Sequence, residues 1–161
     1  MTEETPAKPK PRGIWPPQAL LLGLLLQGVA ILWRWPISPP TWAMGLGVVL
    51  FLMGVGLNFS AAMEFRRKKV GIVPFTPSEM LALGGPYRFT RNPMYIGMSL
   101  ILAALAVGTG LWFDLLIPLV FLVWVHNAYV LPEEAFLEAR YGADYDTYRR
   151  RIPRWIGLGG R

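Results

Sequence analysis

The stretch YIGMSLILAALAVGTGLWFDLLIPLVFLVWVHNAYVL, residues 95–131, is almost entirely apolar, with one acid, Asp114, and no lysine or arginine. A single helix over this range, rising about 1.5 Å per residue, would be far longer than the roughly 30 Å hydrocarbon core of a bilayer. Gly108-Thr109-Gly110 interrupts the run. The stretch therefore predicts a helical hairpin with membrane spans near 94–108 and 111–131.

Two further apolar segments, residues 17–35 and 41–63, precede the hairpin and are separated by a proline-rich connection. With 53% hydrophobic and 16% charged residues, the chain is too apolar for an ordinary soluble domain. We expect an all-α integral membrane protein with about four transmembrane helices. Small residues let helices pack closely in a bilayer, and the second segment carries Gly45, Gly47, Gly54 and Gly56.

The segments outside the spans are polar. Residues 1–16 are proline-rich and predict a disordered basic tail, which leaves residues 17–161 as one membrane-embedded domain. Residues 70–94 predict a loop at the membrane surface. Residues 133–151 combine charged and aromatic side chains and predict a C-terminal cytoplasmic amphipathic helix.

The distribution of cations predicts the topology. Of the 16 lysine and arginine residues, only Arg34 would lie on the side of the membrane opposite to the others. This bias predicts a multi-pass protein of the cell (inner) membrane with both termini cytoplasmic. The net charge is +6, and the basic residues flank the apolar spans, so their placement favours anionic lipid over nucleic acid as a partner. The chain has no cysteine and only His126, so neither a disulfide nor a metal centre is predicted.

Arg91, Asn92 and Pro93 mark the start of the first arm of the hairpin. Pro93 suits the first helical turn and Asn92 suits the N-cap. Arg91 has two interpretations. It either reaches a lipid phosphate, or it uses its forked donor beside a helix N-terminus to bind a carboxylate.

Glu133 and Glu134 follow the second arm and have two interpretations as well. Acids in the first turn of a helix are stabilising in any protein. Alternatively, one carboxylate receives an ammonium group while the other pairs with an arginine of the 84–94 loop. His126, inside the same arm, is interpreted as a helix–helix hydrogen bonder rather than a catalyst.

Tyr141, Tyr145 and Tyr148 recur at helical spacing and predict a common face. That face belongs either to a helix resting in the lipid headgroups or to a lid whose aromatic rings cover a ligand.

The segment GPYRFTRNPMYIG (residues 85–97), the apolar hairpin, Glu133-Glu134 and the run from Tyr141 to Ile156 are similar, in order and spacing, to one family. Over about residues 80–157 the chain resembles the isoprenylcysteine carboxyl methyltransferase and phospholipid methyltransferase family, and among its members the short bacterial ones. The resemblance implies an integral membrane methyltransferase that uses S-adenosylmethionine.

The resemblance also implies the site residues. Arg91 and Glu134 would be catalytic. The family often has histidine at the position of Asn92, and asparagine keeps a hydrogen bond but cannot exchange a proton near neutral pH. The implied cofactor-binding set is Tyr87, Arg88, Arg91, Asn92, Pro93, Tyr95, Gly97, Glu133, Glu134, Tyr145, Tyr148, Arg149 and Arg154.

Our hypothesis is that Arg91 pairs with the carboxylate of the cofactor and that Glu133 or Glu134 receives its ammonium group. The acceptor, a carboxylate or an amine on a lipidic or other apolar molecule, would enter from the bilayer. The alternatives are a non-enzymatic lipid-binding or assembly protein and a reductase on a related membrane scaffold. The sequence leaves the oligomeric state and the identity of the acceptor open.

Overall fold

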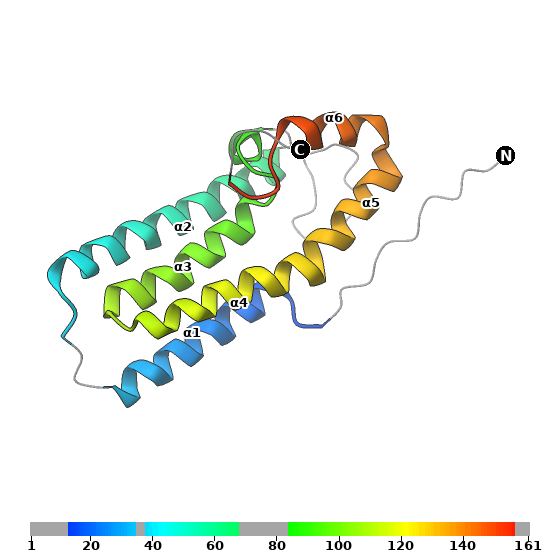
Figure 1. Ribbon diagram of the computed structural model, residues 1–161. Helices are drawn as coiled ribbons and strands as arrows, with labels where there is room; N and C mark the ends of the chain where they lie inside the picture. The colour runs from blue at the N-terminus through cyan, green and yellow to red at the C-terminus, as the bar shows by residue number, and fades with distance from the viewer. Residues whose placement is uncertain (1–12, 35–37, 68–83, 157–161) are drawn as a thin grey trace. The chain divides into compact units, whose positions relative to one another are not determined.

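The computed structural model describes residues 13–34, 38–67 and 84–156, and over these ranges every element is helical (Figure 1). Most of the predicted tail (residues 1–12), residues 35–37 of the first connection and most of the predicted 70–94 loop lie outside the described residues. The elements are α1 (Pro16–Trp33), α2 (Thr41–Arg67), η1 (Gly85–Arg88), α3 (Pro93–Thr109), η2 (Trp112–Leu115), α4 (Leu116–Val125), the π-helical η3 (His126–Val130), α5 (Leu131–Tyr141) and α6 (Ala143–Arg151).

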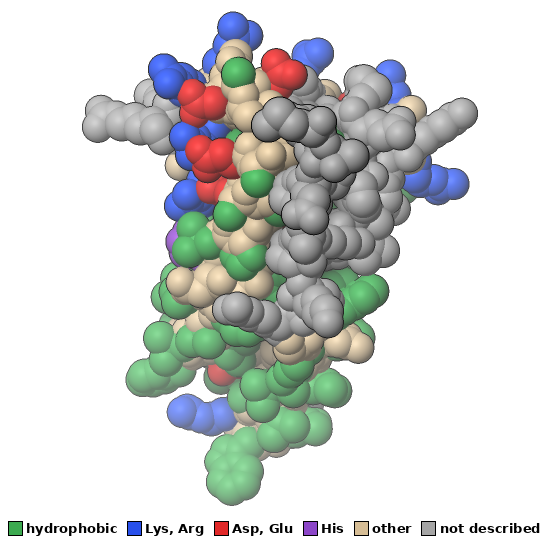
Figure 2. All heavy atoms as spheres, turned by 90° about the vertical axis from the view of Figure 1, so that its right-hand side faces the viewer, with side chains coloured by type: hydrophobic (Ala, Val, Ile, Leu, Met, Phe, Trp, Pro, Cys, Tyr) green, Lys and Arg blue, Asp and Glu red, His purple; other side chains and the backbone are tan. Residues whose placement is uncertain are grey.

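Within the described residues, three helices are long and apolar enough to cross a membrane: Pro16–Trp33, Thr41–Arg67 and the continuous run Trp112–Tyr141. Helix α3 is apolar but has 17 residues, which is the lower limit for a span. The all-helical fold is confirmed over the described residues, with three runs that could span a membrane, and the fourth span stays a prediction. On the face drawn in Figure 2, acidic and basic side chains gather on one part of the surface and hydrophobic side chains dominate another.

The chain forms two compact units. The first consists of Met1–Gly13, Ser60–Pro93 and His126–Arg161, and the second of Ile14–Phe59 and Met94–Val125. The prediction of a single domain over residues 17–161 stays a prediction.

In the second unit, α2 packs closely on α3, as the glycines of α2 predict (Figure 1). A Cβ added to Gly47 would lie 2.7 Å from a backbone Cα of α3, and one added to Gly54 would lie 2.7 Å from a backbone carbonyl oxygen of α3. Neither position has room for a side chain. The other two glycines, Gly45 and Gly56, have nothing within 4 Å, so they take no part in this close packing.

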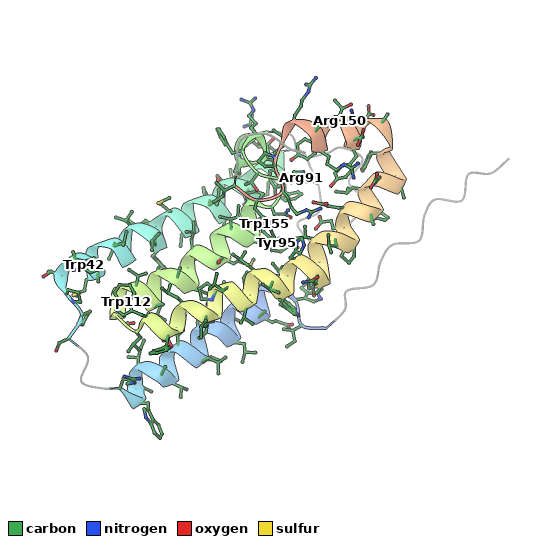
Figure 3. All side chains as sticks on the ribbon, in the orientation of Figure 1. Trp42, Arg91, Tyr95, Trp112, Arg150 and Trp155 are labelled. Carbon is green, nitrogen blue, oxygen red and sulfur yellow. The ribbon has the colours of Figure 1, made fainter. Side chains whose placement is uncertain are left out.

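The helical hairpin turns where the sequence predicts the interruption. Helix α3 ends at Thr109, and Gly110 has a φ of +72°, a left-handed conformation that favours glycine. Beyond it, Trp112 stacks on Trp42 of α2 with ring centroids 6.0 Å apart (Figure 3). This contact ties the turn of the hairpin to the start of α2.

In the first unit, the predicted helix near 133–151 is resolved into two helices, α5 and α6. Gly142 separates them with a φ of +48°, which turns the chain sharply (Figure 1). Tyr141 therefore ends α5, while Tyr145 and Tyr148 lie on α6. The common face predicted for the three tyrosines is interrupted, and only Tyr145 and Tyr148 share a helix.

Candidate functional site

The site lies in the first unit and is centred on Arg91. The turn that precedes this residue is formed by Gly85, with a φ of +54°, and by Pro86, which open the short helix η1. The turn buries Tyr87 and leaves Arg88 exposed. Arg91 lies two residues before Pro93, where α3 begins, and the Arg91 side chain is only 7% exposed.

Glu134, near the start of α5, is held by two arginines. Its Oε1 forms an ion pair with Arg91 Nη1 at 2.8 Å and accepts a hydrogen bond from Arg154 Nε at 2.9 Å. Its Oε2 accepts a hydrogen bond from Arg154 Nη2 at 2.7 Å. The Glu134 side chain is 13% exposed, so these ion pairs are largely shielded from solvent. The prediction that one of the paired glutamates meets an arginine of the 84–94 loop is confirmed for Glu134.

Arg91 is held on a second side by Tyr145 of α6, whose hydroxyl accepts a hydrogen bond from Arg91 Nη1 at 3.0 Å. Among the described residues, Arg91 Nε is buried and meets no hydrogen-bond acceptor. A buried guanidinium with a free donor is costly unless an acceptor completes it. The remaining donor capacity of Arg91 is therefore suited to an anionic ligand.

Arg91, Glu134 and Tyr145 line a small cavity of about 80 Å³ together with Glu133. No ion pair or hydrogen bond reaches Glu133 from within the described ranges 13–34, 38–67 and 84–156. The cavity thus brings Arg91 and two glutamates together. The full lining is Phe65, Tyr87, Arg91, Asn92, Val130, Glu133, Glu134, Leu137, Tyr145 and Tyr148.

The residues that follow α6, 152–156, which we call the C-terminal strap, bind the Arg91 loop through backbone groups. The Arg91 amide donates to the carbonyl of Pro153 at 3.0 Å. The carbonyl of Arg154 accepts hydrogen bonds from Thr90 Oγ1 and Asn92 Nδ2, each at 3.0 Å. The strap therefore fixes Thr90 and Asn92, the two neighbours of Arg91, and the side-chain amide of Asn92 donates its hydrogen bond to the strap.

Aromatic side chains close the cavity. The Tyr148 hydroxyl donates to the carbonyl of Tyr87 at 3.0 Å, and the Tyr87 ring meets the edge of Phe65 with centroids 5.4 Å apart. Burial raises the pKa of the Tyr145 phenol to about 12, with a further contribution from the charge of Glu134. Burial likewise raises the pKa values of Tyr87 and Tyr148. All three phenols are neutral hydrogen-bonding groups at neutral pH.

Several residues of the predicted site have other contacts. Arg149 pairs with Glu138 at 3.3 Å and with Asp146 at 2.8 Å and does not line the cavity. Hydrogen bonds from Arg149 and Arg150 lower the pKa of Asp146. Figure 3 shows Arg150 on the outer side of α6, away from Arg91.

Tyr95 and Gly97, also predicted for the site, belong to the second unit. Gly97 packs against Asn58 and the carbonyl of Gly54, so its described contacts are those of a helix-packing glycine. His126 lies beside Trp155 of the strap, with ring centroids 6.1 Å apart.

Thr90 and Phe65 take part in the site although the sequence did not single them out. Phe65 was passed over because it lies within the basic run Glu64–Lys69. An aromatic residue within a basic run was the one feature of the sequence that could have indicated a role for Phe65 in the site. Thr90 gave no signal beyond its place next to Arg91.

The sequence profile of the family described as Phospholipid methyltransferase matches residues 42–144, which is more than half of the chain. The chain belongs to the phospholipid methyltransferase family. The match includes Arg91, Glu133 and Glu134, ends before Tyr145 and begins after α1.

A curated protein of Haemophilus influenzae, described as an uncharacterized protein, is 29% identical over 63 residues, which are 39% of this chain and 100% of that protein. No solved structure matches the chain. Family membership and the apolar helices together support a multi-pass membrane methyltransferase in general.

Proposed function

We propose that the protein is an S-adenosylmethionine-dependent methyltransferase whose acceptor is a lipidic or membrane-partitioned small molecule with a carboxylate or an amine. The observation that carries the proposal is the charge arrangement around one cavity. The Arg91 guanidinium and the carboxyl groups of Glu133 and Glu134 line the cavity, and Arg154 pairs with Glu134 beside it. This arrangement complements the amino-acid end of the cofactor, which carries one carboxylate and one ammonium group.

The residues fit that end of the cofactor. Arg91 Nε is a buried donor without an acceptor among the described residues, and Glu133 is a carboxylate in the same cavity. The cavity of about 80 Å³ is smaller than the roughly 300–1,000 Å³ of typical ligand pockets, so it would admit the amino-acid end alone.

The contacts support separate proposed roles for the two glutamates. Glu134 is already neutralised by two arginines, so its role is to position the Arg91 guanidinium. Arg91 would bind the carboxylate of the cofactor, because a guanidinium matches a carboxylate in geometry and charge. Glu133, which meets no cation within the described part of the chain, would receive the ammonium group.

The bound cofactor supplies a methyl group that its sulfonium already activates. The protein must then hold the donor in line with the acceptor and keep water out. Arg91, Glu133 and Glu134 would fix the cofactor, and the rings of Tyr145 and Tyr148 would cover it. A carboxylate acceptor needs no base. An amine acceptor must lose a proton, and neither Asn92 nor the high-pKa tyrosines can take it.

The site would work at the cytoplasmic face of the cell membrane. The cations that flank the spans support this orientation, with both termini in the cytoplasm. A lipidic acceptor could then diffuse within the bilayer to the site.

Calorimetric titration of S-adenosylmethionine into the detergent-purified protein tests the proposal. We expect binding in the wild type, loss of binding in Arg91→Ala and Glu134→Ala, and unchanged binding in Arg150→Ala, whose side chain is 77% exposed. Wild-type affinity in both Arg91→Ala and Glu134→Ala would refute the site. No binding in a folded sample supplied with lipid would favour the alternative, a non-enzymatic lipid-binding protein.

A further inference from the structure

The second unit contains a groove of about 340 Å³, and none of its lining residues belongs to the cavity beside Arg91. It is lined by α1, α3 and α4, and no charged side chain contributes to it. Its volume lies within the range of roughly 300–1,000 Å³ that is typical of ligand pockets. The lining residues are Ile14, Ala19, Leu22, Gly23, Leu26, Leu102, Leu116, Ile117, Val120, Phe121 and Trp124.

Helix α1 provides one wall of the groove and lies outside the region that matches the family. Two contacts hold it in place. A Cβ on Gly23 would lie 2.8 Å from a methyl group of Leu102, so the missing side chain lets α1 approach its neighbours. Four residues on, Gln27 Nε2 donates to the carbonyl of Leu102 at 2.9 Å in a fully buried position. The groove is therefore a fixed feature of the packing of α1.

The setting of the groove indicates its occupant. Helices α1 and α4 belong to two of the three runs that can cross a membrane, Pro16–Trp33 and Trp112–Tyr141. A wall that is almost entirely apolar, in that environment, favours hydrocarbon over water or a polar ligand. Along α4 the groove follows Leu116 to Trp124, roughly 12 Å at 1.5 Å per residue, so it suits an elongated hydrocarbon.

We propose that this groove binds one hydrocarbon chain of a membrane phospholipid, held as a resident lipid between α1 and α4. The inference requires only that these helices span the membrane and is independent of the proposed methyl transfer. Ordinary contact with bulk lipid differs in a measurable way. Bulk lipid would touch all exposed apolar residues of the two helices in proportion to their exposure, whereas a bound chain would favour those in the groove.

Photolabelling in vesicles measures that difference. The full-length protein would be reconstituted in phosphatidylcholine vesicles doped with phosphatidylcholine that carries a diazirine near the end of one acyl chain. Labelled residues would then be mapped by mass spectrometry. Leu22 and Val120 line the groove and are 47% and 66% exposed, whereas Leu25 and Leu119 are 67% and 58% exposed and lie outside it.

We expect labelling several-fold higher at Leu22 and Val120 than at Leu25 and Leu119. Labelling that follows exposure alone would overturn the proposal. In a second arm, Val120→Trp fills the groove and Leu119→Trp adds the same side chain next to it. The first should reduce labelling at Leu22 and the second should not. Equal labelling at Leu22 in both variants would overturn the proposal even if Val120→Trp proved less stable than the wild type.

Discussion

Asn92 donates its side-chain amide to the backbone carbonyl of Arg154 at 3.0 Å, while the side chain of Arg154 grips Glu134. Asn92, in the loop before α3, thus fixes the backbone of Arg154, whose side chain binds Glu134 beside Arg91. Asn92 therefore serves as a hydrogen-bond donor to the C-terminal strap, and an amide carries no proton that it could exchange near neutral pH.

Removing that donor should loosen the strap. In Asn92→Ala, the Arg154 carbonyl keeps only the hydrogen bond from Thr90 Oγ1. Loss of one largely buried hydrogen bond costs about 1 kcal/mol, so we expect S-adenosylmethionine binding to weaken roughly fivefold. Limited proteolysis should show faster cleavage near residues 152–156. Unchanged affinity together with unchanged proteolysis would mean that Asn92 does not hold the strap.

Replacing Arg154 by lysine should cost more than the retained charge suggests. The guanidinium of Arg154 donates to both oxygens of Glu134, and an ammonium group cannot reproduce this two-pronged contact. We expect Arg154→Lys to weaken cofactor binding roughly tenfold, or about 1.4 kcal/mol, in calorimetric titration. Arg151→Lys, at an exposed position, is the matched control. If both variants bind equally well, charge alone is sufficient at this position.

The sequence predicted the start of α3 and the turn of the hairpin near Gly110 because both depend on local chemistry. The ion pair between an arginine of the 84–94 loop and Glu134 joins residues far apart in the chain, and the sequence offered it as one of two interpretations. The division of roles between Glu133 and Glu134 was out of reach. Neighbouring residues on a helix point about 100° apart, so only one of them can face Arg91. Which one does so depends on the phase of the helix. The π-helical turn His126–Val130 shifts that phase just before α5, and its sequence is not distinctive.

The break at Gly142 was missed for a related reason. The spacing of Tyr141, Tyr145 and Tyr148 fits a continuous helix, and one glycine inside such a pattern is often tolerated. The positive φ of Gly142 lets α6 turn back, so that Tyr145 hydrogen-bonds Arg91 and Tyr148 hydrogen-bonds the carbonyl of Tyr87. Contacts distant in sequence decided the outcome there.

Two glycines of α2 should respond in opposite ways to the same change. In Gly54→Ala the new methyl group would lie 2.7 Å from the carbonyl of Gly97, a backbone atom that cannot move aside easily. We expect destabilisation of about 1–3 kcal/mol. Gly56→Ala meets nothing within 4 Å, and alanine favours helix, so this variant should match or slightly exceed the wild type. Unfolding in mixed micelles with increasing sodium dodecyl sulfate measures both, and equal effects would contradict the observed packing of α2 on α3.

The buried tyrosines predict how the site responds to alkali. The pKa of Tyr145 is raised to about 12, and those of Tyr87 and Tyr148 are raised as well. Because the folded-state pKa exceeds the ordinary value near 10, the neutral phenols stabilise the folded protein fully below about pH 10. This stabilisation is lost as the pH rises through the folded-state value, since burial disfavours the phenolate.

Near-ultraviolet absorbance of phenolate tests this directly. In the native protein, part of the tyrosine signal should appear at a distinctly higher pH than in the denatured protein, and with a steep rise as the first unit opens. Tyr145→Phe should reduce the delayed fraction without abolishing it, because Tyr87 and Tyr148 remain. Superimposable titrations of native and denatured protein would show that these phenols are accessible to solvent, and the enclosed cavity beside Arg91 would then be wrong.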